Sequence, residues 1–335
     1  MEMELAAPPP EEAEWQAITA VEVSKPVEHR DPRTAKIVDD FKDSTLTALN
    51  ISDLPVALPE VQRICECVKL RASSNAISTI NLMYTDIGNS GADKLATVLK
   101  ATTTVRTLSL VGSLVGSDGA TSLSKALQEA NSSVTTLDLS ENQIQDAGAQ
   151  KIARSLEKNT ALKTLKLCYN KIGTMGCARL AQAVGEGAPE FIRPANAPPG
   201  RKVKPETKIN ANKSLTMLDL EGNEIGKQGA ERLANMLTVN TTLKGLNLAN
   251  CMIEDSGACH LAMSLKKNSS LTDLSIRNNE LTQFSAIRLA AALESNSALV
   301  YLDMMENAIG STGVNSFRKA FDTNTTLKEL LRDQA

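Results

Sequence analysis

The chain has 335 residues, enough for two average domains or one elongated repeat domain. Its net charge of −3 gives no global attraction to nucleic acid or to a membrane surface, and its aromatic content of 3% argues against a large aromatic core. We therefore expect its partners to be other proteins, with no nucleic acid and no membrane among them.

The first 44 residues form an acidic N-terminal segment with 11 Asp or Glu and 5 Lys or Arg. Its opening, MEMELAAPPPEEAE, lacks the basic region and the apolar run of a secretory signal. No apolar run in the chain approaches the roughly 18 residues of a membrane span. We expect an intracellular, cytoplasmic protein whose six cysteines are free thiols.

The only tryptophan of the chain lies in this segment, in PEEAEWQAITAVEV. Trp15 and Ile18 fall at helical spacing, and a short amphipathic helix with one tryptophan is a common anchor on a partner. The alternative is a disordered leader. The end of the segment, residues 31–41, predicts a capping helix that Pro32 opens and whose inward face carries Val38 and Phe41.

From about residue 46 the sequence repeats with a period of 28 residues. Each copy starts with an alternation of apolar and polar residues, as in a short strand, and continues with leucines and alanines spaced by four, as in a helix. The copies are 28 or 29 residues apart, with one exception of 53 residues, and a degenerate copy, LTALNI, precedes them. The pattern Leu-x-x-Leu-x-Leu begins at Ile77, Val105, Val134, Leu162, Leu215, Leu243, Leu271, Leu299 and, as a partial copy, Leu327.

Two polar positions recur in the predicted turns. The ninth residue of a copy is often Asn, whose amide can hydrogen-bond the buried backbone between neighbouring coils. These asparagines are Asn142, Asn170, Asn223, Asn279 and Asn307. In six of eight copies a small polar residue stands two positions before the helix glycine, where we expect an N-cap; Lys227 and Gln283 are the exceptions. The predicted N-caps are Asn89, Ser117, Asp146, Thr174, Asp255 and Ser311.

These motifs resemble the leucine-rich repeat, specifically the 28-residue ribonuclease-inhibitor-like class with the pattern LxxLxLxxNxIxxxGxxxLxxxL. The resemblance covers roughly residues 46–335. It implies an α/β fold, a leucine-rich-repeat solenoid shaped as a horseshoe arc with a parallel β-sheet on its concave face and α-helices on its convex face. We expect the N-terminal segment, residues 1–44, to be followed by one domain of about eight to nine repeats, residues 45–335.

The aberrant spacing marks a Pro-rich, basic insertion at residues 187–211. Its prolines favour an extended excursion from the helix-to-strand edge of the arc. Phe191 would anchor it on this edge, while Arg193, Arg201, Lys202 and Lys204 would project toward a partner with an acidic surface. The alternative is a tolerated surface insertion, because loops accept extra length at modest cost.

The resemblance places positions 3, 5, 7 and 8 of each repeat on the concave face. All three tyrosines of the chain stand at these positions, where carboxylates also outnumber bases. Tyr and Met are enriched at interface cores, so we expect this face to bind a protein with a basic surface. Plain solvation of scattered side chains is the alternative. The candidate residues are Met83, Tyr84, Asp138, Glu141, Tyr169, Met217, Asp219, Glu221, Asp273, Arg277, Tyr301, Asp303, Met305 and Glu306.

The sequence offers no constellation of residues that is typical of catalysis. It has only two histidines, His29 and His260, and it has no GxxxxGK[ST] nucleotide-binding motif. Cys65 and Cys67 have no second pair at metal-ligand spacing. We therefore expect no enzyme, no metal site and no cofactor.

The leading interpretation is a non-enzymatic protein–protein interaction scaffold or adaptor within a larger intracellular assembly. The chain resembles cytosolic and ciliary scaffold proteins of the class, so an axonemal or other cytoskeletal assembly is the preferred setting. The chain stops half a repeat after its last full copy, in LKELLRDQA, so we expect a partner to cover that end.

Two alternatives remain. Ran-type GTPase-activating proteins have very similar repeats, although they usually carry a strongly acidic C-terminal tail, which this chain lacks. Tropomodulin-like proteins cap actin filaments, and VRTLSLVGS is reminiscent of their repeats, although their long N-terminal half is missing here.

Overall fold

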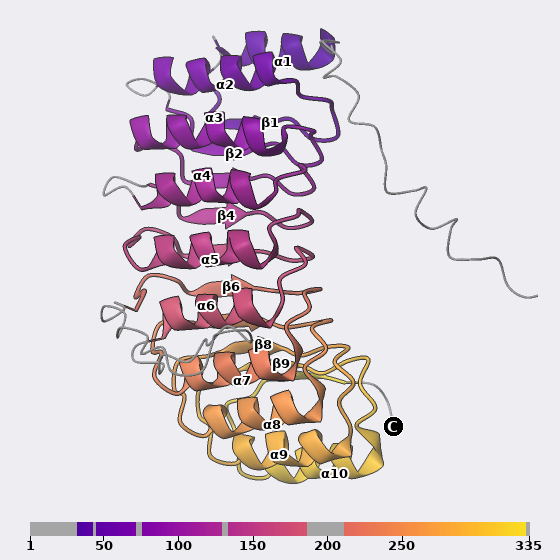
Figure 1. Cartoon of the computed structure of the whole chain (residues 1–335). Coiled ribbons are helices and arrows are strands. Elements are labelled where there is room, and N and C mark those ends of the chain that lie inside the picture. Colours follow the sequence, from indigo (N-terminus) through magenta and orange to yellow (C-terminus); the bar gives the residue numbers. More distant parts are fainter. Residues whose placement is uncertain (1–31, 43–44, 72–75, 129–132, 186–210, 333–335) are drawn as a thin grey trace, which may run out of the picture.

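The computed structural model describes residues 32–42, 45–71, 76–128, 133–185 and 211–332. Within these residues ten helices alternate with ten strands, and the strands form one parallel sheet in sequence order. Figure 1 shows the helices stacked along one side of the sheet, from α1 at one end of the molecule to α10 at the other. The predicted α/β solenoid is confirmed.

Each repeat contributes one strand of three residues and one helix. The strands are β1 (Ala48–Asn50), β2 (Thr79–Asn81), β3 (Thr107–Ser109), β4 (Thr136–Asp138), β5 (Thr164–Lys166), β6 (Met217–Asp219), β7 (Gly245–Asn247), β8 (Asp273–Ser275), β9 (Tyr301–Asp303) and β10 (Glu329–Leu331). The helices are α1 (Pro32–Lys42), α2 (Leu58–Leu70), α3 (Gly88–Ala101), α4 (Ser117–Leu127), α5 (Gln145–Leu156), α6 (Thr174–Val184), α7 (Gly226–Leu237), α8 (Glu254–Leu265), α9 (Gln283–Leu293) and α10 (Gly310–Ala320). No helix among the described residues is long and apolar enough to cross a lipid bilayer.

One continuous core lies between the sheet and the helices. In the repeat that starts at Leu215, the strand residues Leu218 and Leu220 and the helix residues Leu233 and Leu237 are fully buried. The same positions are apolar in each copy, so the core extends through the whole stack. A single repeat cannot bury this apolar surface alone, which is why the units are stable only when stacked.

The helix α1 and the strand β1 cover the N-terminal end of the stack. Val38 and Phe41 of α1 are buried, and Ile37 packs against the core. The guanidinium of Arg71 donates a hydrogen bond to the carbonyl oxygen of Phe41 at 3.0 Å and lies over the Phe41 ring. The degenerate copy LTALNI provides β1, which pairs with β2. These contacts cover the apolar end of the first full repeat.

The asparagines of the predicted turns form a ladder between coils. Asn223 donates from Nδ2 to the carbonyl oxygens of Leu167 and Leu220, both at 2.8 Å, and its Oδ1 accepts from the backbone N–H groups of Asn170 and Ile172, both at 3.0 Å. A second ladder, of Asn159, Asn212, Asn240, Asn268, Asn296 and Asn324, runs along the opposite, helix-to-strand edge. Both ladders satisfy backbone groups that the stacking buries.

The predicted N-caps are wrong. All six residues lie inside the first helical turn, because each helix begins at or just before them. Three of them instead accept hydrogen bonds from backbone N–H groups of the next coil. Asp146 Oδ1 accepts hydrogen bonds, both at 2.8 Å, from the backbone N–H groups of Gly173 and Gly176, where α6 begins. Asn89 and Asp255 make the equivalent contacts to the starts of α4 and α9. The free amides of a helix start are therefore satisfied by the preceding repeat.

The insertion leaves the sheet intact. Most of its residues lie outside the described part, but the flanks at Gly185 and Ala211 are described. β5 pairs directly with β6, with Thr164 opposite Met217, as if the two repeats were consecutive. The backbone N–H of Asn212 donates to the carbonyl oxygen of Ala183 at 2.8 Å, which closes the base of the insertion.

Candidate functional site

Position 3 of the repeats divides the concave face into two halves. In β2–β5 this position is occupied by four threonines stacked in register, Thr79, Thr107, Thr136 and Thr164. In β6–β9 the same row continues as Met217, Gly245, Asp273 and Tyr301. The backbone is the same in both halves, so the solenoid itself does not require this change of residue.

The varied half contains a hollow of about 620 Å³ over β6–β9. Seven of the predicted concave residues line it, together with six that were not predicted. The predicted ones are Met217, Glu221, Asp273, Arg277, Tyr301, Asp303 and Glu306. The others are Leu246, Asn247, Ala249, Asn250, Leu274 and Ser275. A volume of this size can accept one or two side chains of a partner.

Gly245 makes room for the side chain of Met217, which lines the hollow. A Cβ atom at this position would lie 2.3 Å from the Sδ atom of Met217, which means that the Met217 side chain lies flat over the glycine. The thioether therefore covers the strand at the position where the neighbouring repeat has no side chain. Met217 gives the hollow an apolar and adaptable wall.

One wall of the hollow is a carboxylate held by fixed donors. Glu221 Oε1 accepts hydrogen bonds from the Tyr169 hydroxyl at 2.9 Å and from Asn250 Nδ2 at 3.3 Å. Its Oε2 accepts a third from Asn247 Nδ2 at 3.1 Å. These three neutral donors keep the Glu221 side chain in one orientation.

The opposite wall also carries carboxylates. Asp303 is nearly buried and accepts hydrogen bonds from the Ser275 hydroxyl at 3.2 Å and from its own turn, through the backbone N–H of Met305, at 3.0 Å. Glu306 is paired with Arg277. Four carboxylates and one guanidinium thus line the hollow, so its potential favours a cation.

The side chain of Tyr301 lies among these charges. Burial, followed by the charges of Asp303, Glu329 and Asp273, raises the pKa of its hydroxyl above the usual value. The phenol is therefore neutral at physiological pH. It offers an aromatic surface and a hydrogen-bond donor at the same point.

The other two tyrosines lie over glycines of the next repeat. A Cβ atom at Gly112 would be 2.4 Å from Tyr84 Cδ1, and one at Gly222 would be 2.2 Å from Tyr169 Cδ1. The Tyr84 hydroxyl donates to Glu141 Oε1 at 3.1 Å, as Tyr169 does to Glu221. Both rings remain about half exposed. They are part of the concave surface but lie outside the hollow.

The remaining predicted residues are not in the hollow. Asp138 pairs with Lys166 at 3.7 Å in the threonine half. Burial raises the pKa of Asp219, which lies beside Glu221. Met83 and Met305 are half-buried. Seven predicted residues, Phe191, Arg193, Arg201, Lys202, Lys204, Trp15 and Ile18, lie outside the described residues.

Sequence reasoning missed the neutral members of the hollow. Asn247, Asn250 and Ser275 occupy the same concave positions 5 and 8 as the predicted residues, so the repeat alignment contained the signal. The prediction counted only charged, aromatic and Met side chains. Gly245 was missed for the same reason, although a glycine in a strand commonly marks a close approach of another group.

The chemistry of the face suits binding. Cys168 lies beside Asp219, and burial together with this charge raises the pKa of its thiol to about 12, so the nucleophilic thiolate is not populated at neutral pH. Among the described residues, no group of three or more His, Cys, Asp or Glu side chains is arranged to hold a metal ion.

Comparison with known proteins identifies the repeats. The Leucine Rich repeat family model matches residues 74–96, 130–153, 211–234, 239–262 and 295–317. No curated protein matches the sequence. Similar solved structures include the Leiomodin-1 Actin-Binding Site 2, with 27% identity over 32% of this chain and a TM-score of 0.31. Another is the C-terminal domain of Caenorhabditis elegans tropomodulin, with 20% identity over 37% of this chain and a TM-score of 0.33.

The matched segment covers 64% of the leiomodin structure and 77% of the tropomodulin structure. The five repeat matches are distributed along the solenoid on both sides of the insertion. The chain therefore contains leucine-rich repeats, and its fold is a leucine-rich-repeat α/β solenoid.

Proposed function

We propose that the chain is a non-enzymatic interaction scaffold that binds a partner protein through the hollow over β6–β9. The observation that carries this proposal is the hollow itself, about 620 Å³ in volume and lined by four carboxylates, one guanidinium, Met217 and Tyr301. Charged rims with an aromatic and a Met side chain at the centre are typical of protein interfaces.

The partner presents a lysine or arginine side chain to this hollow. Glu221 and Asp303 are held by neutral donors that do not cancel their charge, so the potential between these two walls favours a cation. Tyr301 and Met217 would pack on the aliphatic stem of that side chain. A stable interface buries about 800 Å² on each side, so the hollow is an anchoring point within a larger concave contact.

We extend this proposal to the class of leucine-rich repeat and to the cellular assembly in which the chain acts. The 28-residue period supports assignment of the repeats to the ribonuclease-inhibitor-like class. A scaffold of this kind would act as a subunit of a larger intracellular assembly, and cytoskeletal and axonemal assemblies are the first to test.

The direct test is quantitative affinity capture with the immobilised full chain. Asp273→Lys places a cation at the exposed rim of the hollow, and Glu294→Lys makes the same change of charge beyond the end of α9. We expect a set of partners that wild type and Glu294→Lys retain and that Asp273→Lys loses. If Asp273→Lys retained every partner of the wild type, the hollow would not be the binding site.

The two alternatives from the sequence have their own assays. A Ran-type GTPase-activating protein would accelerate GTP hydrolysis by Ran, and a tropomodulin-like cap would slow depolymerisation of actin filaments. For a scaffold, we expect neither effect from purified full chain. Either effect, if abolished by Asp273→Lys and not by Glu294→Lys, would assign that activity to the hollow in place of scaffolding.

A further inference from the structure

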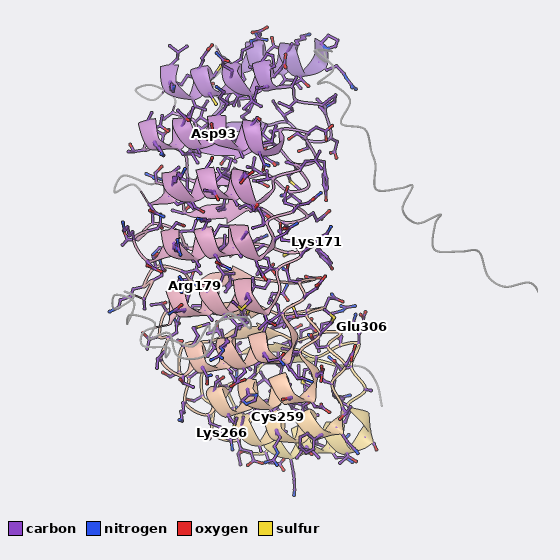
Figure 2. The ribbon with its side chains drawn as sticks, viewed as in Figure 1. Asp93, Lys171, Arg179, Cys259, Lys266 and Glu306 are labelled. Carbon is purple, nitrogen blue, oxygen red and sulfur yellow. The ribbon has the colours of Figure 1, made fainter. Side chains whose placement is uncertain are left out.

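A second charged surface lies on the helix-to-strand edge of the solenoid, away from the hollow. Six exposed lysines gather there, which we call the lysine edge. They are Lys158, Lys163, Lys213, Lys244, Lys266 and Lys267. Figure 2 shows Lys266 on the opposite side of the ribbon from Lys171 and Glu306, which lie on the strand-to-helix edge.

The hydrogen-bond ladders hold these lysines in register. Lys163 and Lys244 directly precede β5 and β7, and the backbone of Thr216 bridges them, accepting a hydrogen bond from one and donating to the other. Strands lie about 4.8 Å apart, so the two lysines are roughly 10 Å apart along the edge. Their fields overlap, because this spacing is close to the Debye length of about 8 Å at physiological salt.

A second row follows the asparagine ladder of the same edge. This row consists of Lys158, Lys213 and Lys267. Each of them is adjacent in sequence to one asparagine of the ladder, namely Asn159, Asn212 or Asn268. None of the six lysines forms an ion pair with another described residue. The carboxylate nearest to any of these lysines in sequence is that of Glu157, which directly precedes Lys158. The lysine edge therefore carries an excess of positive charge that no ion pair among the described residues neutralises.

Stability of the solenoid explains only part of this charge. Lys158, Lys266 and Lys267 follow the ends of α5 and α8, where a cation interacts favourably with the helix dipole. Lys163, Lys213 and Lys244 precede strands, where no such effect operates. Three lysines thus add to the cluster without a role in the fold.

We propose that the lysine edge binds the acidic N-terminal segment of the same chain, residues 1–31. This segment lies outside the described residues and carries eight Asp or Glu against two Lys or Arg. The opposite charge of the two parts supports the pairing. The attachment of the segment to α1 supports it further, because a tether raises the effective concentration to the millimolar range.

The segment is long enough to reach the edge. Helices pack 8–10 Å apart, so α5 lies about 40 Å along the stack from α1. An extended chain spans about 3.4 Å per residue, so Glu11, Glu12 and Glu14 can reach roughly 60–70 Å from Pro32. Contact within one chain is therefore geometrically possible for Lys158, Lys163 and Lys213.

The single tryptophan of the chain reports on this contact, because Trp15 lies next to the acidic run. Acrylamide quenching of Trp15 is measured on the full chain at about 0.02 M and about 0.5 M salt. The edge variant is Lys163→Gln/Lys213→Gln/Lys244→Gln. The control variant, Lys94→Gln/Lys151→Gln/Lys171→Gln, removes the same charge from other exposed positions.

We expect at least a twofold increase in the quenching constant of Trp15 in the edge variant at low salt, and a similar increase in wild type at high salt. The control variant should match wild type. Equal quenching in wild type and the edge variant at low salt would overturn the proposal.

Carbodiimide cross-linking of the wild-type full chain then identifies the contacted lysines, with a mixture of isotopically light and heavy chains. Links within one chain from residues 2–31 to Lys163, Lys213 or Lys244 support the proposal. Links between chains, or links mainly to lysines of the insertion or to Lys171, contradict it.

Discussion

The two halves of the concave face share one backbone and differ in the residues they display. In β2–β5 position 3 is threonine four times in succession, and the side chains stack in register. In β6–β9 the same position is Met, Gly, Asp and Tyr, and a hollow of about 620 Å³ opens there. Repeats of one chain thus serve as controls for one another, and a change that the fold does not require supports the proposed binding role of the varied half.

The insertion lies at the boundary between these halves. It leaves after α6 and returns before β6, while the pairing of β5 with β6 continues unbroken. The asparagine ladder also crosses the boundary, through Asn223 and its bonds to the preceding repeat. The scaffold is therefore continuous where the surface changes.

The largest expected effect on stability comes from removing Asn223, the asparagine that links the two halves. Asn223→Ala would leave two backbone N–H groups and the carbonyl oxygen of Leu167 without partners in the buried turn, at a cost of about 3 kcal/mol in the free energy of unfolding. Urea denaturation measures this loss, with a less cooperative transition as the halves uncouple. Asn235→Ala on the exposed face of α7 is the control, expected to cost less than about 0.5 kcal/mol. A loss below about 1 kcal/mol for Asn223→Ala would show that the ladder does not join the halves.

A smaller effect is expected at the glycine under Tyr169. Gly222 has a φ of +68°, so Gly222→Ala incurs about 1–2 kcal/mol of backbone strain and must also displace the ring. Gly310 has a φ of +59° with nothing within 4 Å of the place where a Cβ atom would lie, so Gly310→Ala incurs the strain alone. Thermal denaturation should therefore rank Gly222→Ala below Gly310→Ala in stability. The reverse order would mean that the ring does not rest on the glycine.

The tyrosine at the boundary should titrate differently from a free phenol. The hydrogen bond to Glu221, followed by burial, raises the pKa of Tyr169 from 10.0 to about 12. The stability that this contact contributes is fully present below about pH 10 and is lost as the pH rises toward about 12. Phenolate absorbance should show that Glu221→Gln lowers the pKa of one of the three tyrosines back toward 10. An unchanged titration curve would contradict the hydrogen bond.

The smallest effect on stability is expected when the varied half is made to resemble the uniform one. Asp273 is exposed and Tyr301 partly exposed, and threonine is favoured in strands, so Asp273→Thr/Tyr301→Thr should change the free energy of unfolding by less than about 1 kcal/mol. Urea denaturation checks this. A loss of several kcal/mol would mean that these side chains hold the solenoid together and are not reserved for binding.

The repeat period allowed the fold to be predicted, because leucines and asparagines at fixed spacing dictate the core and the turns. The hollow was predicted only in part. Glu221 and Tyr301 are recognisable by charge and by residue type. Gly245 instead leaves space for the Met217 side chain, and Asn247 donates a hydrogen bond to Glu221 of the preceding coil. The N-caps were mispredicted for a related reason. Asp146 bonds across coils, and such contacts depend on the stacking of repeats and not on local sequence.

The most direct test compares matched substitutions in the two halves. The affinity of a captured partner is measured for wild type, for Asp273→Thr/Tyr301→Thr in the hollow, and for Tyr84→Asn/Glu141→Asn. The last variant removes the tyrosine–carboxylate pair of the uniform half with a residue that tolerates the positive φ of both positions. We predict at least tenfold weaker binding for the first variant, which corresponds to about 1.4 kcal/mol, and a change below about twofold for the second. Equal losses in both variants, or a greater loss in the second, would contradict the assignment of binding to the hollow.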